Sequence, residues 1–124
     1  MTLSIKNLTK IYSGNKKAVD NISLNIEAGE FVAFIGTSGS GKTTALRMIN
    51  RMIEPTEGSI EMNGKDVRNM NPVELRRSIG YVIQQIGLMP HMTIRENIVL
   101  VPKLLKWSKE KKDAKAKELI KLVD

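Results

Sequence analysis

Eight consecutive residues have the composition and spacing of a phosphate-binding loop. The segment Gly36–Thr43 reads Gly-Thr-Ser-Gly-Ser-Gly-Lys-Thr and fits the pattern Gly-x-x-x-x-Gly-Lys-Thr. Its glycines permit backbone conformations that a Cβ would penalise, so consecutive N–H groups can point into one anion-binding concavity. The Lys42 ammonium can then reach the β- and γ-phosphates of a nucleotide, and the Thr43 hydroxyl is placed to bind Mg²⁺. The sequence therefore predicts a nucleotide-binding site.

The segments on either side of the loop have the patterns that such a site requires. Phe31–Ile35 is apolar at every position, which is typical of a strand buried on both faces of an α/β sheet. Lys42–Arg51 is compatible with a helix, whose N-terminal dipole would favour an anion at the loop. The alternative, a flexible loop of glycine and serine, accounts for neither flanking pattern.

Further strands are expected on both sides of the loop. Leu3–Ile11 and Val19–Ile26 alternate between apolar and polar residues and are separated by the polar turn Ser13–Lys16. Gly58–Met62 leads into Asn63-Gly64, a pair that is typical of a tight hairpin turn. These patterns predict three strands, each with one solvent-exposed face or a tight turn at its end.

The second half of the chain carries helix signals and one more apolar strand pattern. Ile79–Ile83 resembles a buried strand, and Asn71 can cap a short helix that begins at a proline. Thr93–Glu96 is a capping-box pattern that opens a helix expected to end near Pro102. Alternation of strands and helices predicts an α/β fold.

Composition excludes several classes of protein. The chain has 124 residues, no cysteine, and 20 Lys plus Arg against 13 Asp plus Glu, a net charge of +7. Without cysteine there is no disulfide, thiol nucleophile or cysteine zinc site. The longest apolar runs have five residues, far short of the roughly 20 that cross a membrane. The N-terminus has no secretory pattern, so a cytosolic location is expected.

Lysines are concentrated near the end of the sequence. Val101–Asp124 contains eight Lys against four acidic residues, a pattern that could bind nucleic acid or anionic lipid. Ala116, Leu119, Ile120 and Val123 fall at helical spacing in this segment, which favours a helix whose lysines form the solvated face.

The residues around the phosphate loop resemble the ATP-binding subunits of ABC transporters, through at least Met1–Ile98. The resemblance implies a P-loop NTPase half-domain of the ABC-ATPase type, with amino-terminal antiparallel strands and part of a RecA-like core. Residues 1–124 would form the amino-terminal part of a single ATP-binding domain. In the family Tyr12 would stack on adenine, and Val19 would add an apolar contact to the same base.

The resemblance also assigns roles to individual residues. The expected cofactors are ATP and Mg²⁺. Gln84 would be the Q-loop glutamine that contacts Mg²⁺ and the attacking water, and Gln85 is the alternative for this role. Lys42 and Gln84 are the expected catalytic residues, and Thr43 and Gln84 the expected Mg²⁺ ligands. The expected nucleotide-binding residues are Tyr12, Val19, Gly36, Thr37, Ser38, Gly39, Ser40, Gly41, Lys42, Thr43 and Thr44.

Partners follow from the same resemblance. Ile86–Asn97 would face transmembrane permease subunits, with exposed apolar contacts such as Leu88 and Met89, although these residues could equally be local core. A second ATPase subunit would bind head to tail, a substrate-binding protein would act indirectly, and no nucleic acid is expected. The subunit would lie in the cytoplasm, peripheral to the inner face of the membrane.

Within the family, Thr43–Gly58 looks most like importers of osmoprotectants such as glycine betaine, carnitine or choline. The family's Leu-Ser-Gly-Gly-Gln signature, its Walker B carboxylates and its switch histidine do not occur in this chain, so the chain resembles the amino-terminal part of a longer ATPase. We expect weak nucleotide binding and little turnover by this part alone. Phe31–Ile35 would lack pairing partners there, which favours self-association.

Two alternatives belong to other functional classes. A nucleic-acid-linked ATPase, acting in repair or translation, would use the lysine-rich end and would show salt-dependent binding to DNA or RNA. A P-loop phosphotransferase would need an acceptor site and a lid, for which the sequence offers no candidate.

Overall fold

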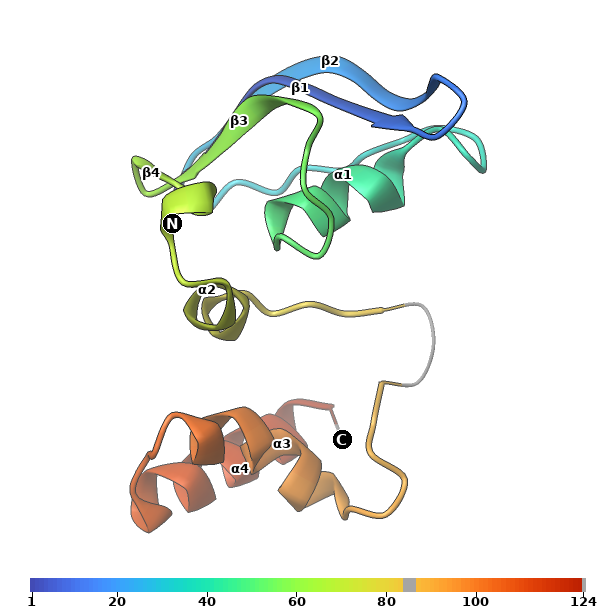
Figure 1. Ribbon diagram of the computed structural model, residues 1–124. Coiled ribbons are helices and arrows are strands. Elements are labelled where there is room, and N and C mark those ends of the chain that lie inside the picture. The colour runs from blue at the N-terminus through green and yellow to red at the C-terminus, as the bar shows by residue number, and fades with distance from the viewer. Residues whose placement is uncertain (84–86, 124) are drawn as a thin grey trace. The chain divides into compact units, whose positions relative to one another are not determined.

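The computed structural model describes residues 1–83 and 87–123 and consists of two units, Met1–Gly80 and Tyr81–Asp124 (Figure 1). The strands are β1 (Leu3–Tyr12), β2 (Lys16–Ile26), β3 (Glu57–Met62) and β4 (Lys65–Asp66). The helices are α1 (Lys42–Ile49), the 3-10 helix η1 (Val67–Asn69), α2 (Pro72–Ser78), α3 (Ile94–Leu104) and α4 (Lys109–Val123). The described strands form one antiparallel sheet in the order β2-β1-β3-β4.

Strands β1 and β2 form a long hairpin with an irregularity in its middle. The pairing shifts between Ile5 and Leu8, where Asn7 has a positive φ of 48°. The Asn7 N–H donates to Ser23 Oγ at 2.9 Å. Consequently Leu8 and Thr9 are both buried, although neighbouring strand residues normally face opposite sides of a sheet. Two further shifts follow, between Leu8 and Lys10 and between Lys10 and Ile11, and the far end of the hairpin then pairs Tyr12 with Lys16.

The core lies between the sheet and helix α1, which runs beneath the strands in Figure 1. Its fully buried side chains are Ile5 and Leu8 from β1, Ile60 from β3, Met48 from α1 and Leu75 from α2. Burial of apolar surface is the dominant favourable term in folding. This core therefore fixes the helix that follows the phosphate loop against the sheet.

The hairpin and the α2 cap that the sequence predicts are confirmed. Asn63 and Gly64 have φ of 51° and 75°, as a two-residue hairpin turn requires. The Asn71 side chain accepts hydrogen bonds from the N–H groups of Val73 and Glu74, and Pro72 occupies the first helical position.

The prediction of buried strands at residues 31–35 and 79–83 is wrong for this structure. Both segments are irregular, and Phe31, Ile35 and Val82 are each at least 94% exposed. A strand is stable only where neighbouring strands satisfy its backbone groups, and no described strand pairs with either segment. Of the first segment, Phe34 packs partly against the core.

Helices α3 and α4 form the second unit and contact each other. Helix α3 begins at a full capping box, in which Thr93 Oγ1 accepts from the Glu96 N–H and Glu96 Oε2 accepts from the Thr93 N–H. These hydrogen bonds lower the pKa of Glu96. The helix ends at Leu104, shortly after Pro102 and near the predicted end.

The contact between α3 and α4 includes polar groups. Arg95 of α3 forms an ion pair with Asp113 of α4. In the connection between the two helices, the Trp107 ring centre lies 4.0 Å from the Lys111 ammonium of α4. Ala116 is the buried residue of α4, whereas Ile120 and Val123 are exposed. Among the described residues, no helix has the length and apolar character needed to span a bilayer.

Candidate functional site

The phosphate loop runs from Gly36 to Gly41 and ends at the first turn of α1. Gly41 is the N-cap residue and has φ of 91°. A Cβ on Gly41 would lie 2.0 Å from the carbonyl oxygen of Ala18 in β2. Only glycine fits this position, since both the backbone conformation and the neighbouring strand exclude a side chain. The loop is thereby held closely against β2.

Gly41 has no side chain to cap the helix, so the first N–H groups of α1 keep no side-chain partner. Such N–H groups, together with the positive end of the helix dipole, favour an anion. Lys42, Thr43 and Thr44 form this first turn, and all three line one cavity, which is described below. The backbone here has the polarity expected of a phosphate cradle.

The Lys42 ammonium lies within the loop. Nζ donates to the carbonyl oxygens of Gly36 at 2.8 Å and Thr37 at 2.7 Å, and to Ser40 Oγ at 3.2 Å. A further loop contact runs from the Ser40 N–H to the Thr37 carbonyl at 3.2 Å. These bonds place a positive charge at the centre of the loop and give it a defined shape.

A cavity of about 430 Å³ connects the loop with the end of the first hairpin. Its volume falls in the range of small-molecule sites. Tyr12 lines it and is 42% exposed. The Lys10 ammonium lies 5.4 Å from the centre of the same ring. The lining residues are Tyr12, Lys16, Lys17, Ala18, Gly39, Ser40, Gly41, Lys42, Thr43 and Thr44.

The structure brings most of the predicted nucleotide-binding residues together. Tyr12 and the segment 39–44 share the cavity, and Gly36 and Thr37 join through their bonds to Lys42. Ser38 is exposed in the loop and does not line this cavity. Val19 is buried next to Gly41 and lines a neighbouring cavity of about 620 Å³, which shares Ser40, Gly41 and Lys42 with the first. Gln84 and its alternative Gln85 lie outside the described residues.

Sequence reasoning missed Lys16 and Lys17, which also line the cavity. The signal was available in the turn between β1 and β2. A short turn at residues 13–15 places Lys16 directly opposite Tyr12. Any ligand stacked on the tyrosine would therefore lie beside a lysine. Lys17 is also paired with Asp20 at 2.9 Å.

The described part of the expected permease-facing segment is held by one side chain. Asn97 Oδ1 accepts from the Met89 N–H at 2.7 Å, and Asn97 Nδ2 donates to the carbonyls of Met89, Met92 and Thr93. Leu88 and Met89 are exposed and so are not part of a local core. Ile86 lies outside the described residues.

Comparison with known proteins decides the family. A family model described as "ABC transporter" matches residues 19–124. The chain belongs to this family. It is 71% identical over 122 residues to the carnitine transport ATP-binding protein OpuCA of Listeria monocytogenes, covering 98% of this chain and 31% of that protein. The choline transport ATP-binding protein OpuBA of Bacillus subtilis is 59% identical, with 98% of this chain and 32% of that protein covered.

A third relative is the osmoprotectant import ATP-binding protein OsmV of Salmonella typhimurium, 50% identical over 98% of this chain and 33% of that protein. The chain thus spans about a third of the length of these relatives. Among solved structures, the ATP-binding cassette MJ0796, dimeric and bound to ADP and Pi, matches with a TM-score of 0.80 and 37% identity, covering 96% of this chain and 56% of that one. The predicted P-loop NTPase half-domain of the ABC type is confirmed.

Proposed function

We propose that this chain is the amino-terminal part of the ATP-binding subunit of an ABC importer. The observation that carries the proposal is the single cavity shared by Tyr12 and the phosphate loop. An aromatic face at one end and a cationic, N–H-rich cradle at the other match the base and the phosphates of ATP. The named relatives are transport ATP-binding proteins, which does not support a nucleic-acid-linked ATPase.

The residues present fit a magnesium nucleotide. The first turn of α1 has no side-chain cap, so its N–H groups can bind an anion, and the Lys42 ammonium already lies among the loop carbonyls. The Thr43 hydroxyl in the cavity is a hard oxygen donor, which Mg²⁺ accepts alongside phosphate oxygens. When bound, Mg²⁺ would neutralise charge that develops on the phosphates. Lys42 would bind the β- and γ-phosphates, and Gln84 would orient the attacking water.

The complete protein would act with partners. A second ATPase subunit would bind head to tail, permease subunits would contact Ile86–Asn97, and the subunit would sit at the cytoplasmic face of the membrane. The exposed Leu88 and Met89 support such a contact. The names of the relatives support quaternary-amine osmoprotectants, such as carnitine, choline or glycine betaine, as the transported solutes.

Uptake by the complete natural transporter in vesicles tests this function. We expect ATP in the compartment that the ATP-binding subunit faces to drive transport of a labelled quaternary amine from the other side of the membrane. Lys42→Ala should abolish uptake, whereas Lys65→Ala, which alters an exposed lysine in the β3–β4 hairpin, should not. Uptake that survives Lys42→Ala contradicts the proposal. ATP hydrolysis without uptake of carnitine, choline or glycine betaine contradicts the solute class alone.

A further inference from the structure

Helix α1 ends in a left-handed turn at Arg51, a position where glycine is usual. Arg51 has φ of 52°. Its N–H donates to the Met48 carbonyl at 3.1 Å, and the Met52 N–H donates to the Arg47 carbonyl at 2.9 Å. This pair of bonds defines a Schellman motif. A residue with a Cβ is strained in this conformation, so the arginine side chain is expected to compensate.

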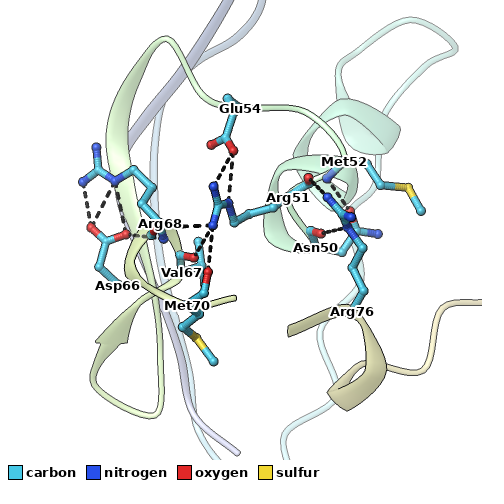
Figure 2. A network of polar contacts seen from close by, with 9 residues as sticks. All are labelled: Asn50, Arg51, Met52, Glu54, Asp66, Val67, Arg68, Met70 and Arg76. Carbon is cyan, nitrogen blue, oxygen red and sulfur yellow. Dashed lines mark hydrogen bonds and ion pairs between the residues drawn. The ribbon is translucent and has the colours of Figure 1, made fainter. Parts of the chain in front are cut away.

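The guanidinium of Arg51 joins α1 to the segment around η1, as Figure 2 shows. Nη1 donates to the carbonyl oxygens of Val67 at 3.0 Å, Arg68 at 3.3 Å and Met70 at 3.0 Å. Nε and Nη2 donate to Glu54 Oε1 at 3.0 and 2.9 Å. The side chain is only 17% exposed. Arginine suits this place because its planar fork directs several donors at fixed angles.

Arg76 of α2 holds the same helix end from a second direction. Its Nε donates to the Asn50 carbonyl at 3.2 Å, and its Nη2 donates to the Arg51 carbonyl at 2.6 Å (Figure 2). These carbonyls lie at the negative end of the α1 dipole, where a cation is favourable. Asn50 is buried, and its Oδ1 accepts from the Met52 N–H at 3.1 Å. The C-terminal end of α1 is therefore fixed on two sides.

We propose that Arg51 is a positioning residue of the nucleotide site, an inference that rests on the proposed function. Helix α1 has eight residues and so is about 12 Å long. Lys42 and Thr43 stand at its other end. Rotation of α1 by about 5° around its C-terminus would shift that end by about 1 Å. A misplacement of about 1 Å at a reacting centre can cost about a hundredfold in reaction rate.

The variants separate positioning from stability. Arg51→Gly keeps the left-handed turn without strain and removes the guanidinium, and Arg51→Lys keeps the charge without the fork. Arg68→Ala is the matched control, because the Arg68 side chain is bonded to Asp66 and donates no hydrogen bond to α1. The readout is the ratio of MgATP affinity to AMP affinity, measured by calorimetry on the complete natural protein. AMP shares the base but lacks the β- and γ-phosphates that Lys42 would bind.

We expect Arg51→Gly to lower the MgATP affinity by about tenfold to a hundredfold, which corresponds to the loss of one hydrogen bond to a charged phosphate, and to leave the AMP affinity unchanged. Arg51→Lys should give an intermediate ratio, and Arg68→Ala the natural one. A general loss of stability would lower both affinities together. A folded Arg51→Gly protein with the natural ratio overturns the inference. If that variant does not fold, a natural ratio in Arg51→Lys overturns it, and a lowered ratio supports it.

The controls separate this inference from the proposed function. If the natural protein and Arg68→Ala bind MgATP while Arg51→Gly shows the natural ratio, the inference alone fails. If the natural protein itself does not bind MgATP, the proposed function fails and the inference fails with it.

Discussion

Replacement of Gly41 by alanine tests whether the phosphate loop depends on close contact with β2. The added Cβ would lie 2.0 Å from the Ala18 carbonyl oxygen, at a backbone φ of 91°. Real Cβ atoms approach other heavy atoms to about 3.0 Å, so loop and strand would separate by about 1 Å. The left-handed conformation costs about 1–2 kcal/mol and the overpacking about 1–3 kcal/mol. The free energy of unfolding should therefore fall by about 2–5 kcal/mol.

Gly64→Ala isolates the conformational cost. Gly64 has φ of 75°, and a Cβ there would meet no atom within 4 Å. It lies in the β3–β4 turn and does not line the proposed nucleotide cavity. This variant should lose about 1–2 kcal/mol of stability and retain its MgATP affinity. Denaturant unfolding and calorimetric MgATP titration measure both quantities for the two variants.

The outcome that refutes this reasoning is specific. If Gly41→Ala unfolds no more easily than Gly64→Ala and binds MgATP as tightly, the contact with Ala18 does not shape the loop. We expect instead that Gly41→Ala is the less stable variant and loses about tenfold to a hundredfold in MgATP affinity, because the displaced loop loses a hydrogen bond to the charged phosphates.

Four further predictions concern single features. Tyr12→Ala should weaken MgATP binding by about 1–3 kcal/mol through lost stacking, whereas Tyr12→Phe should retain it, as calorimetry would show. Asn71→Ala should destabilise the first unit by about 0.5–2 kcal/mol in denaturant unfolding, because two capping bonds are lost, and Asn71→Asp should not. The capping box lowers the pKa of Glu96 from 4.5, so the ionised Glu96 stabilises α3 fully above that pH, and this stabilisation is lost as pH falls through the lowered pKa. Glu96→Gln should remove this part of the acid dependence, measured by the helical circular dichroism signal. Light scattering should show self-association of residues 1–124, reduced by Phe31→Asp, and a mass of one chain with sharp melting contradicts this.

The sequence predicted the turns and helix caps that depend on residues close together in the chain. The Asn63-Gly64 turn and the Asn71 and Thr93 caps depend on residues within a few positions of each other, and the structure contains each of them. The alternation in β1 and β2 likewise follows from burial of one face. Such signals need no knowledge of the rest of the chain.

The wrong predictions depended on distant partners. Residues 31–35 and 79–83 have the composition of buried strands, but composition does not supply the neighbours that a strand must bond to. The bulge at Asn7 is a second example, since it depends on Ser23 across the hairpin. A single sequence contains no signal for such pairings.

The candidate site was also predictable where its residues are adjacent in the sequence, and not where they are distant. The phosphate loop is one continuous segment, so its motif revealed it. Its link to Tyr12 came from family resemblance, and the structure places both in one cavity. Lys16 and the Arg51 contacts were missed because they arise from strand register and from carbonyls about 16 to 19 residues away. The role of Gln84 stays a prediction.

The central claim is that the cavity between Tyr12 and the phosphate loop binds ATP through Lys42. Calorimetric titration of MgATP into the protein, beside Lys42→Ala and with MgGTP as a control, tests it most directly. The account predicts binding that favours ATP and is lost in Lys42→Ala, while Lys65→Ala binds normally. A folded complete protein that does not bind MgATP, or a Lys42→Ala protein that binds it as tightly as the natural one, contradicts the claim.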